Sequence, residues 1–358
     1  MKFLDVVKEK KYILCSNCFQ DSGLKNMSLK IGFSSSKICP NCKTNNGKKL
    51  NRPSLRWLAQ SFFVRGTVFK CDYGAAPLVQ FNEHHYKESD IEVSEWLKND
   101  IKLIEESIKV GFFHYGPRLW MVGEVEPLKS LQEKKERNQI IETILDRYPS
   151  RTFNEKESFY RLRKNPSSPE NISEYDSPPD AFCGKGRLDS TNLPMLYGSQ
   201  DIEVCVHECR VTVEDELYLA TITAKKELKL LDLSEIIDDD TSEFESIDIA
   251  IHMLFLAGEH SYEITRDIAI AAKEKGYDGI IYPSYFSLLR TGSMPFDTIY
   301  GISIRKLPGT VEYAKSQIIQ NIALFGKPIQ EEIVKVGCIN KLILNKIIYD
   351  IHFGPVGF

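Results

Sequence analysis

The stretch AFCGKGRLDSTNLPMLYGSQDIEVCVHECR, residues 181–210, places an arginine, a tyrosine and a glutamate ten and eleven residues apart. Two glycines precede Arg187 and allow the backbone to approach a ligand closely. Tyr197 ends a short predicted strand, and Glu208 lies on a predicted helix that Ser199 could cap. Either these are three unrelated surface residues, or the chain folds to bring them to one pocket.

The three side chains have complementary chemistry. The planar guanidinium of Arg187 suits a diphosphate, and the Tyr197 side chain offers both a stacking face and a hydroxyl. The Glu208 carboxylate can stabilise a positively charged sugar in a transition state. Together they are the groups needed to cleave an N-glycosidic bond in a dinucleotide. The alternative interpretation is a helix acid and a surface arginine without a shared role.

Composition indicates a soluble globular protein. The chain has 358 residues, enough for about two or three domains, with 42% hydrophobic and 27% charged residues. A net charge of -4 argues against a chain that coats nucleic acid along its whole length. Neither a membrane span nor a signal peptide is predicted, so we expect a cytoplasmic protein without a membrane partner.

Two cysteine pairs near the start of the chain predict a metal site. The sequences CSNC (15–18) and CPNC (39–42) are two CxxC knuckles separated by twenty residues. Two such knuckles complete a tetrahedral Zn²⁺ shell, which we assign to Cys15, Cys18, Cys39 and Cys42. Four thiolates leave no open position on the metal, so the zinc should be structural. The alternative is four buried free cysteines.

The same segment is basic. Residues 1–56 contain twelve lysines and arginines and three acids. Phosphate neutralisation by such a face would favour nucleic acid as a partner. The alternative is a solvated ribbon, or one that contacts a partner protein.

Periodicity predicts the remaining elements. Apolar residues at three- and four-residue spacing predict helices over 91–110 and 127–147, and alternation predicts strands over 157–164 and 216–224. Residues 57–150 are therefore expected to be mostly helical. Residues 164–180 are rich in Pro, Ser and Asn and predict a loop. Residues 262–287 predict a helix followed by a buried strand, with Ser284 just beyond the end of the strand.

Four segments together resemble the RES domain family: RLRK (161–164), GRLDSTNLPMLYGSQDIEVCVHE (186–208), GYDGIIYPS (276–284) and NIALFG (321–326). The resemblance covers residues 157–345. It implies an α+β fold like that of the ADP-ribosyltransferases, built around a split β-sheet. Family members are bacterial toxins that degrade NAD⁺, some as phosphorylases and others as glycohydrolases or ADP-ribosyltransferases.

The resemblance also implies roles for individual residues. Arg187 would contact the phosphate or the nicotinamide ribose, Tyr197 would contact the ring, and Glu208 would be the catalytic carboxylate. Ser284 would be a polar residue of the pocket. Weaker candidates for NAD⁺ contacts, on neighbouring strands, are Arg161 and Tyr218. In YEITRDIA (262–269), Thr265 matches the expected pattern and Arg266 departs from it.

These inferences combine into one expectation. We divide the chain into a zinc ribbon (1–56), a helical domain (57–155) and an NAD⁺-cleaving domain (156–358). The last would be an NAD⁺ phosphorylase or glycohydrolase that acts as a toxin or as a defence or stress effector. Expected partners are NAD⁺, a phosphate acceptor, an antitoxin or regulatory protein, nucleic acid at the ribbon, and a second copy of the chain.

Two alternatives stay open at this point. The same pocket could serve an ADP-ribosyltransferase that modifies a protein or a nucleic acid. The chain could also be a zinc-dependent nucleic-acid-binding regulator whose second half only senses NAD⁺.

Overall fold

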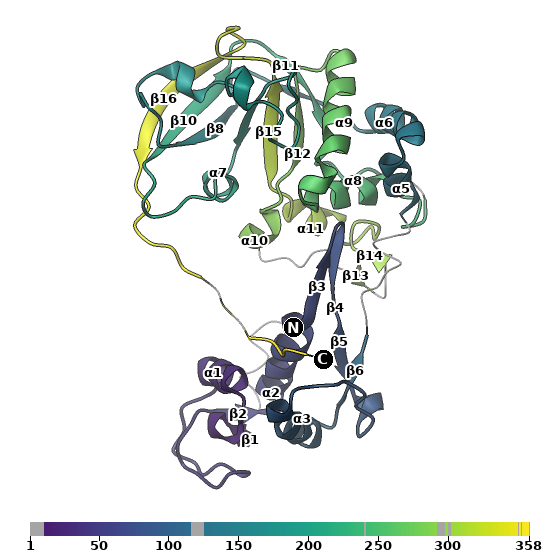
Figure 1. Cartoon of the computed structure of the whole chain (residues 1–358), viewed down its shortest axis with the longest axis vertical. Coiled ribbons are helices and arrows are strands. Elements are labelled where there is room, and N and C mark those ends of the chain that lie inside the picture. Colours follow the sequence, from purple (N-terminus) through teal and green to yellow (C-terminus); the bar gives the residue numbers. More distant parts are fainter. Residues whose placement is uncertain are drawn as a thin grey trace. The chain divides into compact units, whose positions relative to one another are not determined.

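The computed structural model describes residues 11–115, 125–239, 241–291, 298–299, 302–349, 351 and 353–357. The chain divides into two units (Figure 1). The first comprises Met1–Cys71, Ala75–Arg118 and Ile348–Phe358, and the second comprises Asp72–Gly74 and Leu119–Ile347. The sequence predicts three domains, 1–56, 57–155 and 156–358, whose boundaries differ from those of the two units. The division into three domains stays a prediction.

The first unit surrounds one apolar core, in which Leu24, Leu55, Phe63 and Ile104 are fully buried. Its strands form antiparallel pairs, β1 with β2 and β5 with β6. Its elements are β1 (Tyr12–Cys15), α1 (Ser22–Ile31), β2 (Lys49–Asn51), α2 (Arg52–Ala59), a π-helical turn (Gln60–Val64), β3 (Val68–Cys71), β4 (Gly74–Pro77), β5 (Val79–Asn82), α3 (Glu95–Ile108) and β6 (Gly111–His114).

Helix α3 confirms the helix expected over 91–110. Its buried residues recur at the three- and four-residue spacing that defines one helix face. The helix ends where Lys109 adopts a left-handed conformation with φ 56°. Gly111, two residues later, opens β6. A Cβ atom there would lie 1.6 Å from the carbonyl oxygen of His85, so only glycine fits.

The C-terminal residues pack within the first unit. A Cβ atom on Gly66 would lie 2.5 Å from the Cα atom of Gly354, so the two backbones touch. The Ser94 hydroxyl donates a hydrogen bond of 2.9 Å to the carbonyl of Val356. The first unit therefore contains segments from both sides of the second unit in the sequence.

The second unit is a mixed sheet with helices. Its elements are α5 (Glu126–Gln132), α6 (Lys134–Arg147), β7 (Ser150–Phe153), β8 (Ser158–Lys164), β9 (Met195–Ser199), α7 (Ile202–Glu208), β10 (Leu217–Ala224), β11 (Leu228–Asp232), α8 (Ile247–Leu256), α9 (Tyr262–Glu274), β12 (Gly279–Pro283), α10 (Ser287–Thr291), β13 (Thr298–Ile299), β14 (Ile302–Ser303), α11 (Val311–Ser316), β15 (Gln320–Phe325) and β16 (Val334–Leu342). Strands β8 and β10 confirm the two predicted strands, and α9 and β12 confirm the predicted helix and buried strand. The α+β class is confirmed.

The large sheet has the strand order β16–β10–β8–β9–β15–β12–β11–β7 and is split in its middle. Strands β8 and β9 share a single residue pair, Tyr160 with Ser199. Arg161 bridges the gap, because its guanidinium donates hydrogen bonds of 2.8 Å to the carbonyls of Tyr197 and Asp176. One side chain thus replaces several backbone hydrogen bonds between the two halves.

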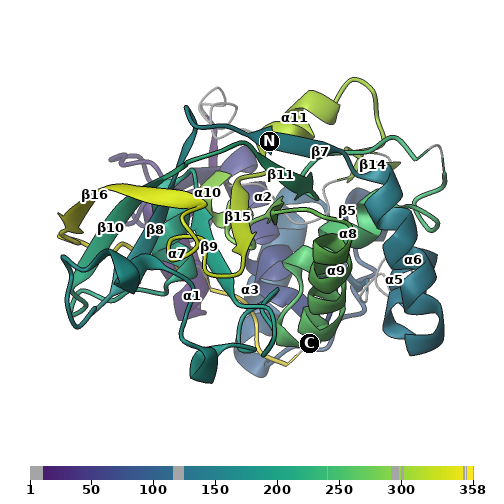
Figure 2. The same ribbon diagram turned by 90° about the horizontal axis from the view of Figure 1, so that it is seen from above.

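The register assigns side chains to the two faces of the sheet, since paired residues point to the same side. One face carries Tyr197, Tyr282 and Asn321 and is covered by α8 and α9 (Figures 1 and 2). The opposite face forms a separate core around Phe159 and Ile322. The candidate site lies on the face covered by helices.

The segment 57–155 contains the expected helices and also short strands. The helix predicted over 127–147 is interrupted at Glu133 and forms two helices, α5 and α6. Their apolar residues Leu128, Leu131 and Ile144 are buried in the core of the second unit. No helix among the described residues is long and apolar enough to cross a membrane.

Candidate functional site

Helix α7 presents Glu208 at its C-terminal end. The helix begins at Ile202 because the Asp201 carboxylate accepts a hydrogen bond of 2.9 Å from the backbone of Val204. The prediction that Ser199 caps this helix is wrong. The Ser199 hydroxyl instead donates to the carbonyl of Gln320 at 2.7 Å and helps to join α7 to the sheet.

Two buried side chains hold the Glu208 carboxylate. Its Oε1 atom accepts hydrogen bonds from Ser284 Oγ at 2.7 Å and from Asn321 Nδ2 at 2.6 Å. Ser284 follows β12 and Asn321 lies on β15, and both are buried. Among the described residues, Oε2 has no hydrogen-bond partner. Glu208 itself is exposed, so a ligand can reach the free oxygen.

Arg187 lies in a cage formed by the end of α8 and the start of α9. Its guanidinium donates to the carbonyls of Leu254 at 3.2 Å and Ala257 at 2.8 Å. The aromatic rings of Phe255 and Tyr262 lie 5.8 and 4.9 Å from its central carbon. The carbonyls at a helix C-terminus and two aromatic faces favour a cation here without neutralising it.

Tyr282 connects the arginine to the glutamate. Its ring stacks on Phe255 with centroids 5.2 Å apart, and its hydroxyl interacts with Asn321, which holds Glu208. Burial raises the pKa of Tyr282 well above its usual value, the Glu208 carboxylate raises it further, and Arg187 lowers it. The charges of Glu208 and Arg187 therefore both act on the Tyr282 hydroxyl. The structure brings Arg187, Glu208 and Ser284 to one side of the sheet.

Tyr197 organises the loop that carries Arg187. Its hydroxyl accepts hydrogen bonds of 2.9 Å from the backbones of Leu188 and Asp189, and donates one of 2.9 Å to the Asp189 carboxylate. Burial, with contributions from Tyr282 and Asp189, raises the pKa of Tyr197 well above its ordinary value. A Cβ atom on Gly186 would lie 2.1 Å from Asp189 Oδ1, which explains this glycine. Contact of the Tyr197 ring with a ligand stays a prediction.

Arg161 and Tyr218 come from the opposite side of the sheet. Tyr218 pairs with Arg163, two residues from Arg161, so their side chains share the face away from α7. Arg161 is buried in the split between β8 and β9, where burial, with help from Arg163, lowers its pKa to about 10. The Tyr218 ring lies beneath Lys341, 5.6 Å from its ammonium group. Among the described residues, neither side chain forms a hydrogen bond or ion pair with Glu208, and their contacts with NAD⁺ stay a prediction.

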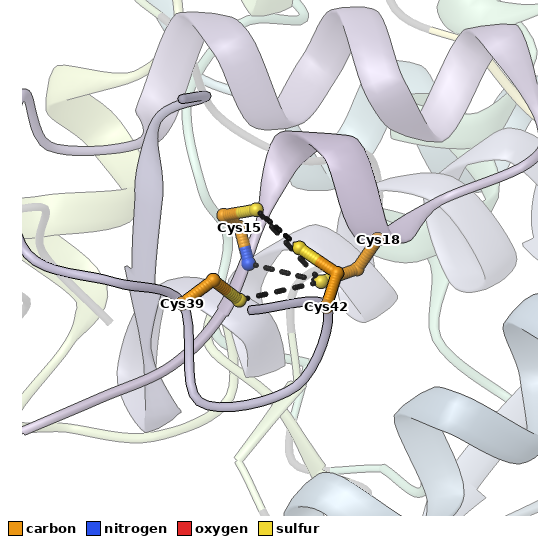
Figure 3. A group of neighbouring side chains, drawn as sticks. All are labelled: Cys15, Cys18, Cys39 and Cys42. Atoms are coloured by element: carbon orange, nitrogen blue, oxygen red, sulfur yellow. Dashed lines mark hydrogen bonds between the residues drawn. The ribbon is translucent and has the colours of Figure 1, made fainter. Parts of the chain in front are cut away.

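The four N-terminal cysteines converge as predicted (Figure 3). All four sulfurs lie within 4.8 Å of one another. The distances are 3.8 Å for Cys15 to Cys18, 3.4 Å for Cys15 to Cys42 and 3.6 Å for Cys18 to Cys39. Tetrahedral Zn²⁺ with bonds near 2.3 Å would place its sulfurs about 3.7 Å apart. The cluster therefore fits zinc and is too open for disulfides.

The basic character of the N-terminal segment is only partly available on its surface. Lys49 is fully buried, and its ammonium group donates to the carbonyls of Asn45, Asn46 and Gly47. Arg56 forms an ion pair with Glu83. Some residues of the charge count lie outside the described residues: Lys2, Asp5, Lys8, Glu9 and Lys10. Nucleic-acid binding by this face stays a prediction.

Two residues of the site, Asn321 and Tyr282, are not predicted by the sequence. Asn321 is a polar residue at the start of the apolar strand QNIALF, which is a visible signal. Tyr282 lies in the buried strand GIIYP, where an aromatic residue is indistinguishable from ordinary core. Both become recognisable only once β12 and β15 are paired.

Comparison with known proteins finds a similarity over part of the second unit. Residues 158–291 match the family model described as the RES domain. A chain from the crystal structure of the M. tuberculosis MbcT–MbcA toxin–antitoxin complex is 13% identical, over 56% of this chain and 91% of that one. Its TM-score is 0.32. No curated protein shows a significant match to the chain.

Proposed function

We propose that this chain is an NAD⁺-consuming enzyme, and the match of residues 158–291 to the RES domain model supports this proposal. The reaction is cleavage of the bond between nicotinamide and ribose. The observation that carries the proposal is the Glu208 carboxylate. Buried Ser284 and Asn321 fix one of its oxygens, and the other oxygen has no hydrogen-bond partner among the described residues. Arg187, which forms no ion pair with a carboxylate in the described part of the chain, and Glu208 both act on Tyr282.

Glu208 stabilises the developing sugar cation. As the bond from ribose C1′ to the nicotinamide nitrogen breaks, its electron pair goes to nicotinamide and positive charge develops on the ribose. Oε2 of Glu208 supplies a fixed negative charge, or accepts a hydrogen bond from a ribose hydroxyl. Ser284 and Asn321 keep the carboxylate in position, which removes the need to reorganise it during the reaction.

Arg187 binds the anionic part of the dinucleotide. Contacts to backbone carbonyls occupy only some of its five N–H groups, and a guanidinium is suited to phosphate oxygens. Tyr197 acts through the loop that it anchors, and so sets the position of Arg187.

The ribosyl carbon then forms a bond to an acceptor oxygen. With water the product is ADP-ribose, and with inorganic phosphate it is the 1″-phosphate of ADP-ribose. Transfer to a protein or nucleic acid is the alternative outcome. Mass analysis of the products, with and without phosphate, separates all three.

The Zn²⁺ that fits Cys15, Cys18, Cys39 and Cys42 has a structural role in this proposal. Burial raises the pKa of the Cys18 thiol to about 12, and a bound metal cation would favour its thiolate. These cysteines belong to the first unit, and the RES domain to the second. No catalytic step involves the metal.

The test compares the wild type with Glu208→Gln and a matched control, Glu203→Gln, on the same helix. Glu203 is exposed and pairs with Arg290. Loss of the fixed charge should lower kcat by about 10² to 10³-fold, whereas Glu203→Gln should retain the wild-type rate. Wild-type protein that leaves NAD⁺ intact would refute the function. A Glu208→Gln variant with unchanged turnover would refute the assignment of the catalytic residue.

We further propose that NAD⁺ loss makes the protein a toxin or a defence effector inside the cell. The similarity of residues 158–291 to the RES domain family supports this role, with an antitoxin or regulatory protein as its partner. Induced expression of the wild type in bacteria should lower cellular NAD⁺ and arrest growth. Expression of Glu208→Gln should do neither.

A further inference from the structure

A second arginine lies beside Arg187. Arg266 is on α9, and its Nε and Nη2 atoms donate to the carbonyl of Gly186 at 3.1 and 2.8 Å. Its guanidinium carbon lies 5.7 Å from the centroid of the Tyr262 ring, and that of Arg187 lies 4.9 Å from the same centroid. One aromatic ring therefore contacts both cations.

Arg187 and Arg266 form no ion pair with a carboxylate in the described part of the chain. The two acids flanking Arg266 on α9, Glu263 and Asp267, bind Arg137 at 3.0 and 2.7 Å. Two guanidinium groups beside one ring repel each other because both are positively charged. A bound anion would offset this repulsion and so would be bound favourably.

No hydrogen bond or ion pair among the described residues joins Arg187 or Arg266 to the Glu208 carboxylate. Contacts lead from Glu208 through Asn321 and Tyr282 to Phe255, then to Arg187. The Tyr262 ring contacts Arg187 and Arg266. Because Glu208 is the group that the proposed function assigns to the reacting ribose, an anion bound by both arginines would be a part of the substrate that does not react.

We propose that Arg266 is a specificity-determining residue that binds the diphosphate of the dinucleotide together with Arg187. This inference rests on the proposed NAD⁺ cleavage and names the chemical feature that the site selects. The guanidinium of Arg266 has N–H groups left after its two contacts with Gly186. Each arginine serves one phosphate, so ligands with a diphosphate bind more tightly than ligands with a single phosphate.

The competing explanation is that Arg266 has only a structural role and holds the Gly186 carbonyl in place through its two hydrogen bonds. Arg266→Lys distinguishes this role from phosphate binding, because lysine keeps the positive charge and loses the planar arrangement of N–H donors. Arg266→Gln removes the charge. The matched control is Arg147→Gln, an exposed residue in the last turn of α6.

The experiment titrates ADP and AMP into each protein by calorimetry, and measures NAD⁺ turnover alongside. In the wild type and in Arg147→Gln, ADP should bind more tightly than AMP. Arg266→Gln should weaken ADP by about ten- to hundredfold and AMP by less than about threefold. It should raise KM for NAD⁺ by a similar factor to that for ADP, with little change in kcat. Arg266→Lys should retain most of the preference for ADP.

Three results would overturn the inference. They are an unchanged ADP affinity in Arg266→Gln, an equal loss for ADP and AMP, or an Arg266→Lys variant as weak as Arg266→Gln. The binding measurement does not need turnover. If the protein does not cleave NAD⁺ but its ADP binding still depends on Arg266, the proposed function is refuted and the diphosphate site is still supported.

Discussion

Removal of the Asn321 amide tests whether the Glu208 carboxylate must be held in place. Asn321→Ala deletes the donor that lies 2.6 Å from Glu208 Oε1 and leaves Ser284 Oγ, at 2.7 Å, as the remaining anchor. Because both contacts fix one oxygen, the carboxylate should keep its charge and lose part of its orientation. The variant should therefore be impaired in kcat and should bind NAD⁺ almost normally.

The expected magnitude follows from the type of bond. A hydrogen bond to a charged group contributes about 1.5 to 3 kcal/mol, which corresponds to roughly ten- to hundredfold in rate. We expect a loss of kcat in this range for Asn321→Ala and for Ser284→Ala, with KM for NAD⁺ within about twofold. Ser287→Ala is the control, because Ser287 is buried nearby and its hydroxyl bonds to the backbone of Ile319 instead of to Glu208.

A charged substitution at Asn321 should make the activity depend on pH, which tests the role of the hydrogen bond to Glu208 in a second way. Asn321→Asp would place a second carboxylate beside Glu208, and two such groups share one proton with a raised pKa for the pair. While the proton is shared, the introduced carboxyl group still donates a hydrogen bond to Glu208. Activity should therefore be retained at lower pH and fall as the pH rises through the raised pKa.

The assay is steady-state NAD⁺ loss, measured from about pH 5 to about pH 9. Asn321→Ala with a kcat at the wild-type level, or with a raised KM as its main defect, would refute the reasoning. An Asn321→Asp variant whose activity increases with pH, as an ordinary carboxylate would predict, would also refute it.

The remaining predictions concern the loop, the metal and the core. Gly186→Ala should reduce turnover at least about tenfold and lower the melting temperature, because its Cβ atom would lie 2.1 Å from Asp189 Oδ1; Gly309→Ala, where the Cβ atom meets nothing within 4 Å, should be silent in both assays. Elemental analysis should find about one zinc per chain in the wild type and less than half of that in Cys39→Ser, whereas equal zinc in both would contradict the four-thiolate site. Tyr148→Phe should raise the free energy of unfolding by about 1 kcal/mol at pH 7, because the buried Tyr148 hydroxyl has no hydrogen-bond partner among the described residues. Burial and the nearby Asp248 raise the pKa of Tyr148, so the unfolded wild type loses this proton first above about pH 10. The advantage of the variant in denaturant titrations should therefore grow above that pH, and a constant difference would argue against a buried neutral phenol.

Local patterns predicted the elements with a clear period. Helix α3 and strand β10 follow spacing rules that need only neighbouring residues. The break between α5 and α6 at Glu133 has no glycine or proline to mark it, so periodicity predicted one helix. Ser199 is a good cap by residue type, but its hydroxyl is taken by the carbonyl of Gln320, 121 residues away.

The site shows the same limit. Arg187, Glu208 and Ser284 could be proposed because each stands in a recognisable motif. Asn321 acquires its role from a contact with Glu208 across 113 residues, which no local rule contains. The face of the sheet on which Arg161 and Tyr218 lie depends on strand register, and the pairing of β8 with β10 decides it. Register was the missing information.

The packing of the C-terminal residues against Gly66 and Ser94 affects the order in which the protein can fold during synthesis. A ribosome adds about 5 to 20 residues per second. It therefore finishes the segment 119–347 before it has synthesised Ile348–Phe358, the last segment of the first unit. The interval between residue 118 and residue 348 is then on the order of ten to fifty seconds. In that interval the nascent chain can complete the part that carries Glu208 while the cysteine-bearing part is still missing its closing segment. The second unit, which carries the candidate site, could therefore fold before the first unit is complete.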